Sequence, residues 1–314
     1  MAEQFDVRPM RGVMRAVWPV VTLAAALVAA VTGCASPGSA SSPGPASSPA
    51  ARRSAPPVSY YLALGDSLSQ GVQPDLSGAS RETPDGYANQ LYSALREHQP
   101  GLLLVKLGCP GETTVSMISG GICSYPGGSQ LAAAVSFLRA HRGHVSLITI
   151  DIGANDPGTC MTRPSITKLA SCTAEAIPAA TVHLTKILMS LRRAAGNTRM
   201  IGMTYYLPAL AEWRDGLLGR LVAHLSELAT VAYNGLLTRT YQAFGVRVAN
   251  VFAAFGGSDF ANKVTVPGYG ALPRNVAAVC TWTWECAGPP RGPNEHANQA
   301  GYAVIARTFL QADD

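Results

Sequence analysis

The sequence predicts an α/β fold in which helices cover both faces of a mainly parallel sheet. Short apolar runs with the character of strands alternate with longer helical patterns through most of the chain, and this alternation is typical of crossover connections between parallel strands. Three of the apolar runs also end in a glycine-containing loop that carries a polar side chain. In an open α/β sheet such loops meet at one edge, where ligands bind.

The strands of the first half are predicted where β-type and apolar residues run together and stop at a turn. One run ends abruptly at Gly-Asp-Ser, and the most strongly apolar run ends at Gly-Ala-Asn-Asp. The helices between them are predicted from spacing, as in Tyr87, Leu91 and Leu95, which recur at helical intervals. These patterns give strands at 60–64, 102–107 and 145–152, and helices at 86–99 and 130–141.

The second half continues the alternation after a long loop. One helix is followed by the pair Gly196 and Asn197, a typical helix stop, and a long amphipathic helix comes next. Residues 254–295 are rich in Gly, Pro and aromatic residues, and we expect them to be irregular. These patterns give helices at 174–195, 215–244 and 298–310, and strands at 199–206 and 245–252.

The first 57 residues are predicted to lie outside the fold. Three arginines precede an apolar run at 16–31, which gives residues 1–34 the form of a signal peptide. The last residues, Val-Thr-Gly-Cys, resemble a bacterial lipobox, so we expect Cys34 to be lipidated and to become the new N-terminus. A plain secretory signal and an uncleaved anchor helix are the alternatives.

Residues 35–57 are rich in Ser, Pro, Ala and Gly and show no apolar periodicity, so we expect a flexible tether. Residues 58–314 are of a length that suits one large α/β domain. We therefore expect an exported monomer at the cell surface or outside the cell, anchored to the membrane by lipid. The net charge of +5 comes from scattered basic residues, which argues against nucleic-acid binding.

Six cysteines remain in the domain, and an even number in an exported domain implies disulfides. They form three short local pairs along the chain, and nearest-neighbour pairing is the expected pattern among 15 possible connectivities. Zinc binding is disfavoured because the sequence has neither Cys-x-x-Cys spacing nor clustered histidines. The expected pairs are Cys109–Cys123, Cys160–Cys172 and Cys280–Cys286.

The loops at the sheet edge carry the groups that acyl transfer requires: a nucleophile, a base and donors for a developing oxyanion. Ser67 follows the first strand, and a bare glycine backbone at Gly111 follows the second. Asn155 follows the third and offers a neutral amide donor. Of the six histidines, five fall on predicted helices or at their ends, whereas His296 lies in a loop before the last helix. A residue of the helix-capping region is the alternative interpretation of His296.

These positions together resemble the SGNH, or GDSL, family of serine esterases and lipases. The resemblance covers about residues 59–312 and is carried by four motifs in order. The residues at 203–208 and the three cysteine pairs also look like the exported actinobacterial branch. The motifs are Gly-Asp-Ser-Leu-Ser at 65–69, Gly-Glu-Thr at 111–113, Gly-Ala-Asn-Asp at 153–156, and His296 followed by Asn298, Gly301 and Tyr302.

The resemblance implies a flavodoxin-like three-layer α/β/α sandwich and hydrolysis of carboxylic esters through an acyl-serine intermediate, without a cofactor or metal. It implies Ser67 as nucleophile and His296 as general base and acid. The oxyanion hole would comprise the Ser67 N–H, the Gly111 N–H and the Asn155 side chain, while Asp66 and Asp156 would shape their turns. The pentapeptide also differs from the Gly-x-Ser-x-Gly elbow of α/β-hydrolases.

Two positions depart from the family pattern. Pro293 stands where the family usually has an Asp that holds the histidine ring. Either a main-chain carbonyl near Pro293 orients His296 in a Ser-His dyad, or Glu295 does; we favour the carbonyl because adjacent side chains point apart. Lys106 stands where many members have Asn.

The expected substrate is a small-molecule or lipid ester. A carbohydrate or cell-wall O-acetyl esterase is the alternative, and a non-catalytic surface binding lipoprotein is a third hypothesis. Apolar pocket walls would favour acyl chains, whereas an open polar groove would favour sugars. The predicted walls are Tyr206, Leu207, Leu210, Trp282 and Trp284.

Overall fold

The structure is a computed structural model that describes residues 57–158 and 166–313, without the side chains of residues 158–174. The signal sequence with Cys34, nearly all of the tether, and the predicted pairing of Cys160 with Cys172 lie outside the described residues. Within them, no helix combines the length and the apolar character that a membrane span requires.

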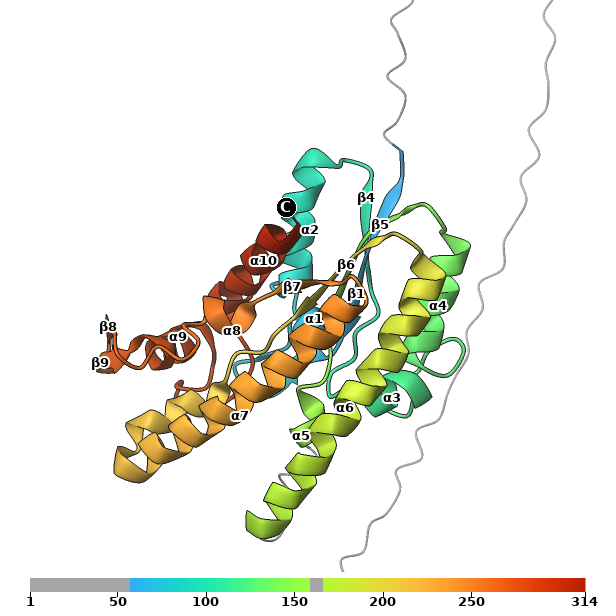
Figure 1. The fold of residues 1–314 in the computed structure, drawn as a ribbon. Coiled ribbons are helices and arrows are strands. Elements are labelled where there is room, and N and C mark those ends of the chain that lie inside the picture. Colours follow the sequence, from blue (N-terminus) through green and yellow to red (C-terminus); the bar gives the residue numbers. More distant parts are fainter. Residues whose placement is uncertain (1–56, 159–165, 314) are drawn as a thin grey trace, which may run out of the picture. The chain divides into compact units, whose positions relative to one another are not determined.

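The central sheet has five parallel strands in the order β4-β1-β5-β6-β7 (Figure 1). Counted along the chain this order is second, first, third, fourth, fifth, which is the flavodoxin-like order with its switch point between the first and third strands. The predicted fold class is therefore confirmed. The strands are β1 (Ser59–Gly65), β4 (Leu102–Lys106), β5 (Val145–Asp151), β6 (Arg199–Met203) and β7 (Arg247–Ala249).

Helices cover both faces of the sheet (Figure 1). On one face α2 (Tyr87–His98) packs against α10 (Gln299–Asp313). On the other, α6 (Ile166–Ala195) lies between α4 (Gln130–Ala140) and α7 (Gly216–Ala243) and contacts both. These three layers bury the sheet on both sides, which explains why its strands read as continuous apolar runs.

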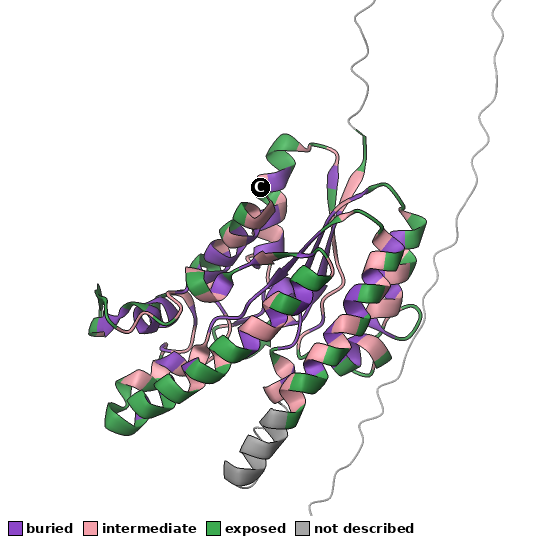
Figure 2. Ribbon diagram, viewed as in Figure 1, coloured by how far each residue is buried: buried purple, intermediate pink, exposed green. Residues whose placement is uncertain are grey.

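β1 and β5 lie inside the sheet and are buried along most of their length (Figure 2). Tyr61, Leu62, Ala63 and Leu64 are each fully buried. The hydroxyl of Tyr61 on β1 lies 2.9 Å from Oγ1 of Thr149 on β5, so a buried polar contact also joins the two strands. The two strands that end beneath the site are therefore held rigidly.

Two predicted strands were too long. β6 ends at Met203 rather than at residue 206, and β7 ends at Ala249 rather than at residue 252. The side chain of Asn250 accepts a hydrogen bond from the Ala253 N–H and caps α8 (Val251–Ala254), so the chain turns into a helix directly after β7.

The prediction that residues 254–295 are irregular was wrong for half of this segment. It contains an antiparallel hairpin of β8 (Lys263–Val266) and β9 (Gly270–Pro273), followed by α9 (Arg274–Trp282). Leu272 and Val276 are buried in a small apolar cluster of this segment. The remaining short elements are α1 (Ser67–Gln70), β2 (Gln73–Pro74), β3 (Ser80–Arg81), α3 (Thr114–Ser119), α5 (Asn155–Gly158) and the 3-10 helix η1 (Pro208–Arg214).

Two of the predicted disulfides are present in the described residues, Cys109–Cys123 and Cys280–Cys286. The first closes the loop that contains Gly111, and the second closes the segment that follows α9. Disulfides persist in oxidising compartments, so these bonds indicate an exported protein.

Candidate active site

Ser67 lies at a sharp turn where β1 runs into α1. Asp66 caps α1, because its Oδ1 accepts a hydrogen bond from the Leu68 N–H at 3.0 Å. Gly65 has a φ of 133°, and a Cβ at this position would lie 2.0 Å from the carbonyl oxygen of Asp151. Only glycine fits there. Ser67 is therefore held half-buried in the first turn of a helix, where backbone N–H groups lack partners within the helix.

The hydrogen bonds of two buried carboxyl groups hold this turn in place. The Asp151 carboxyl accepts hydrogen bonds from the backbone N–H of Ser69 at 3.1 Å and from the Tyr87 hydroxyl. Oδ2 of Asp66 accepts from the hydroxyl of Tyr205 at 3.0 Å. Burial raises the pKa of Asp66 to about 6, and burial together with the nearby Asp66 raises the pKa of Asp151 well above its ordinary value. Asp151 had not been singled out in the sequence.

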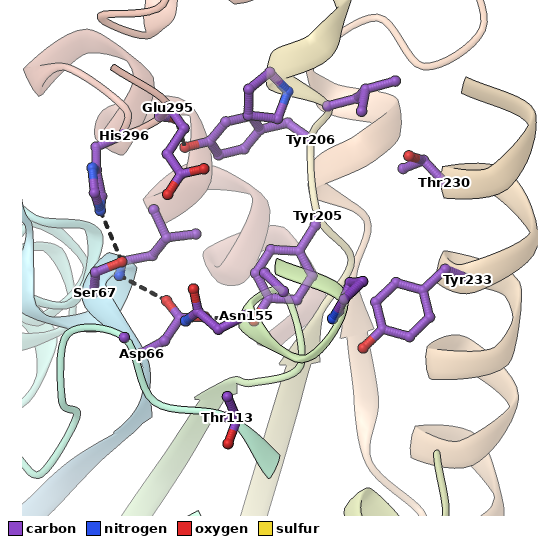
Figure 3. Close-up of a pocket in the computed structure, with 16 residues that line it drawn as sticks. Asp66, Ser67, Thr113, Asn155, Tyr205, Tyr206, Thr230, Tyr233, Glu295 and His296 are labelled. Atoms are coloured by element: carbon purple, nitrogen blue, oxygen red, sulfur yellow. Dashed lines mark hydrogen bonds between the residues drawn. The ribbon is translucent and has the colours of Figure 1, made fainter. Parts of the chain in front are cut away.

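His296 faces Ser67 across the sheet edge (Figure 3). Its Nε2 atom lies 2.9 Å from Oγ of Ser67, although the two residues are 229 positions apart. Its Nδ1 atom lies 2.8 Å from Oδ1 of Asn294. The ring thus links the serine hydroxyl on one side to an amide oxygen on the other.

The hydrogen bonds of Asn294 determine the tautomer of this histidine. Oδ1 of Asn294 also accepts a hydrogen bond from the backbone N–H of His296 at 3.1 Å. A backbone N–H only donates, so the atom that faces it is the amide oxygen and not the amide nitrogen. The same oxygen then requires a proton on Nδ1, which leaves Nε2 free to accept the proton of Ser67.

The structure therefore differs from both expected ways of orienting His296. Neither the carbonyl near Pro293 nor the carboxylate of Glu295 contacts Nδ1; Asn294 does. The physical reason is an Asx turn, in which an Asn side chain binds the N–H two residues later. The pattern Asn-x-His just before a helix was the available signal for it. The Glu295 side chain, adjacent to His296, lines the cavity instead (Figure 3).

The loop that carries His296 is fixed from two sides. The backbone N–H of Trp284 donates to the carbonyl of His296 at 3.0 Å, and the Tyr206 hydroxyl donates to the carbonyl of Glu295 at 2.8 Å. Burial lowers the pKa of His296, while the negative charge of Glu295 opposes this shift. The half-buried imidazole of His296 is therefore neutral at neutral pH.

Two hydrogen-bond donors line the same cavity as Ser67. Gly111 has a φ of 81°, which a side chain would strain, and its backbone borders the cavity. The Asn155 side chain also borders it, and its Nδ2 donates to the carbonyl of Glu112 at 2.9 Å. This bond ties the third strand's loop to the Gly111 loop. Asp156 strengthens the tie, because its carboxylate accepts from the Thr114 N–H at 2.9 Å.

The cavity beside Ser67 has a volume of about 660 Å³. Tyr206 and Leu207 line it, as expected. Other walls that the sequence did not suggest come from α1, from the loops before α3 and after β5, from residues before and within α7, and from the loop before α10. They are Leu68, Thr113, Ala154, Pro157, Tyr205, Pro208, Thr230, Tyr233 and Glu295.

Three residues expected in the pocket lie elsewhere. Leu210 is buried in the apolar cluster beneath α9, and the Trp282 ring packs edge-on against Phe255. The Trp284 ring stacks under Arg291 at 3.7 Å. These expectations were wrong because an aromatic-rich segment without a recognised helix gives no indication of which side chains face the core.

Lys106, which departs from the family pattern, connects two helices by hydrogen bonds. Its Nζ donates to the carbonyl of Gln70 at 3.3 Å and to Oδ1 of Asn89 at 3.2 Å, so it joins α1 to α2. Within the described ranges, no group of three or more His, Cys, Asp or Glu side chains is arranged to hold a metal ion.

Several solved structures share this fold. The chain is similar in structure to phospholipase A1 from Streptomyces albidoflavus NA297, at 17% identity and a TM-score of 0.51 over 82% of this chain and 100% of that one. It is also similar to the acetylxylan esterase Axe2 from Geobacillus stearothermophilus, at 15% identity and a TM-score of 0.50 over 81% and 93% of the chains. A lipase from a goat rumen metagenome, Lip_vut3, gives 17% identity and a TM-score of 0.51 over 81% and 97%.

At these identities the solved structures support the fold alone, and the comparison with curated proteins found no match. A match to a family profile supports membership of a family. The sequence profile of the GDSL-like lipase/acylhydrolase family matches residues 63–304, a span that includes Ser67, Gly111, Asn155 and His296. The chain therefore belongs to the GDSL-like lipase/acylhydrolase family, and it is a carboxylic ester hydrolase.

Proposed function

We propose that the enzyme cleaves its ester through an acyl intermediate on Ser67, with His296 as general base and acid. The observation that carries this proposal is the 2.9 Å contact between Oγ of Ser67 and Nε2 of His296, with Nδ1 held by Asn294. A neutral imidazole with its free lone pair aimed at a hydroxyl is the arrangement that activates a serine.

The reaction proceeds in two halves. Nε2 of His296 takes the hydroxyl proton as Oγ of Ser67 forms a bond to the ester carbonyl carbon. The tetrahedral intermediate then expels the alcohol, which receives that proton from His296, and an acyl-serine remains. Water attacks the acyl carbon with His296 again as base, the carboxylic acid is released, and Ser67 regains its proton.

Three donors stabilise the oxyanion in this mechanism: the N–H of Ser67, the N–H of Gly111 and the amide of Asn155. The last two border the cavity that Ser67 opens into, and the bond from Asn155 to the Glu112 carbonyl preorganises both loops. Donors fixed before the reaction stabilise developing charge without reorganisation, and one such donor contributes about 2.7–4 kcal/mol.

The walls of the cavity favour an acyl chain over an acetylated sugar. Leu68, Leu207 and Pro208 present apolar surface, and Tyr205 and Tyr206 use their hydroxyls in bonds to Asp66 and to the Glu295 carbonyl. A volume of about 660 Å³ exceeds what an acetyl group needs. We therefore propose esters of medium or long acyl chains as substrates.

We also propose that the enzyme acts as a monomeric lipoprotein outside the cytoplasmic membrane. Cys34 in its lipobox-like context and the Ser/Pro-rich stretch at 35–57 support an anchor followed by a tether. Mass spectrometry of the protein from its native membrane fraction tests this: a diacylglyceryl group on Cys34 is expected, and an unmodified Cys34 contradicts it.

The catalytic proposal is tested by hydrolysis of p-nitrophenyl esters from acetate to decanoate. Wild type should be fastest on chains longer than acetate, and Ser67→Ala should lose activity by about 10⁴-fold or more. Ser93→Ala, on the outer face of α2, is the matched control and should retain full activity. Residual hydrolysis by Ser67→Ala near the wild-type rate would refute the mechanism.

A further inference from the structure

α7 is much longer than the sheet requires. It has 28 residues and spans about 42 Å, whereas β6, which precedes it, has five residues and spans about 16 Å. α7 runs back from the carboxyl edge of the sheet, so its surplus length lies at its N-terminal half, which extends beyond the strands (Figure 1). Thr230 and Tyr233, near the middle of α7, line the catalytic cavity.

The projecting half of α7 exposes a continuous apolar face. Gly219, Ala223 and Glu227 form its buried side at a spacing of four residues. The opposite side carries leucines at positions that share one arc of a helix, and Figure 2 shows this half largely exposed. They are Leu217, Leu218, Leu221, Leu225 and Leu228, with exposed fractions of 86%, 72%, 52%, 57% and 63%.

The charges on α7 are of one sign where they face solvent. Arg220 and Arg239 are exposed, whereas Glu227, the one acidic residue of this fully described helix, is buried against Ser258. Arg220 lies over the Trp213 ring at 5.3 Å, beside the leucine face. Along the arc itself no acid is exposed, and the exposed Asp215 lies before it, at the N-cap of α7. An apolar arc with arginine beside it is complementary to a surface of acyl chains beneath anionic headgroups.

We propose that the leucine face of α7 docks the enzyme onto a lipid surface that carries anionic headgroups. The leucines would enter the boundary between headgroups and acyl chains, and Arg220 would lie among the phosphates. α7 also contributes Thr230 and Tyr233 to the cavity wall, so docking through this helix would hold the catalytic cavity close to the lipid from which an ester is drawn. The proposal rests on the proposed function only for this last step, and vesicle binding itself does not require catalysis.

Binding is tested on vesicles of ether-linked phosphatidylcholine and phosphatidylglycerol, which an esterase cannot cleave. The full chain and a Leu221→Ser/Leu225→Ser variant are compared by cosedimentation. The matched control is Val58→Ser/Leu103→Ser, which alters residues 50% and 45% exposed at the opposite edge of the sheet. All three proteins also carry Cys34→Ser, so that the proposed lipid anchor is absent from each of them and a difference between them reports the α7 face.

The α7 variant should bind at least about tenfold more weakly than wild type, and the control should bind equally well. Arg220→Gln should weaken binding only when phosphatidylglycerol is present. Equal binding by wild type and the α7 variant would overturn the proposal. So would a wild-type dimer that the α7 variant converts to a monomer in sedimentation velocity, because the face would then be a contact between two copies.

Kinetics separate this inference from the proposed function. On soluble p-nitrophenyl butyrate, the α7 variant should match wild type, whereas on ester phospholipid vesicles it should be slower by the same factor as its loss of binding. An inactive wild type on soluble ester, with vesicle binding intact, would refute the proposed function alone. Unchanged vesicle hydrolysis by the α7 variant would refute the docking role.

Discussion

Nδ1 of His296 lies 2.8 Å from Oδ1 of Asn294, and that oxygen also accepts a hydrogen bond from the backbone N–H of His296. The amide thus holds the ring and fixes its tautomer, as a carboxylate does in a Ser-His-Asp triad. Unlike a carboxylate, it adds no negative charge to stabilise the imidazolium. The site therefore combines a fully oriented histidine with a neutral third residue.

Replacing Asn294 separates its orienting effect from charge. Asn294→Ala should lower kcat by roughly 10- to 100-fold, because Nδ1 loses its partner and the ring its tautomer. Asn294→Asp should keep activity but raise the pKa of His296, which moves the acidic limb of kcat/KM to higher pH. The measurement is kcat/KM against pH on one soluble ester. An unchanged limb in Asn294→Asp would mean that this residue does not act through the histidine.

Glu295 should control the pH range of activity. Its negative charge raises the pKa of His296 against the lowering effect of burial. In Glu295→Gln the pKa should fall, His296 should stay neutral at lower pH, and the acidic limb of kcat/KM should move down. Glu97→Gln is the control, because Glu97 is an exposed residue near the C-terminal end of α2. A limb that moves upward in Glu295→Gln would contradict the electrostatics described here.

Asn155 should affect the transition state and not substrate binding. Asn155→Ala is expected to lower kcat by about 10²- to 10³-fold with little change in KM, because an oxyanion donor acts only as charge develops. Steady-state kinetics on p-nitrophenyl butyrate check this, and a thermal melt shows whether loss of the bond to the Glu112 carbonyl unfolds the loop. A rise in KM at constant kcat would assign Asn155 to ground-state binding.

Asp66 should make stability depend on pH. Its folded pKa of about 6 exceeds the ordinary 3.8, so between these values the folded state binds more protons than the unfolded state. The free energy of unfolding should therefore fall as pH rises from about 4 through about 6. Asp66→Asn should reduce this slope, as read from urea midpoints across that range, while Asp151, whose buried carboxyl also has a raised pKa, contributes the remainder. An identical slope in both proteins would show that Asp66 is not the titrating group.

The alternation of strands and helices was enough to predict the parallel sheet, because the central strands β1 and β5 are apolar runs that are buried along most of their length and the crossover helices are amphipathic. The hairpin β8–β9 and α9 were missed, since their Gly, Pro and aromatic residues resemble those of a loop. In the structure, β8 and β9 pair in an antiparallel hairpin, and Leu272 and Val276 pack in a separate apolar cluster.

The residues at the sheet edge could be proposed because parallel strands bring their carboxyl ends together. The residue that holds His296 was missed. The pattern Asn-x-His before a helix allows an Asx turn, but a single Asn does not specify the backbone geometry that the turn requires. Trp282 and Trp284 were misplaced for a related reason: an aromatic residue near a site in sequence packs wherever it buries the most surface, here against Phe255 and Arg291.

The most direct test of the catalytic proposal is the mass of the enzyme after reaction with a fluorophosphonate, mapped by peptide sequencing. The activated hydroxyl of Ser67 should carry one phosphonyl group per chain, and neither Ser67→Ala nor His296→Ala should be labelled at a comparable rate. Label on any residue other than Ser67, or full labelling of Ser67 in His296→Ala, would contradict the assignment of Ser67 and His296 as nucleophile and base.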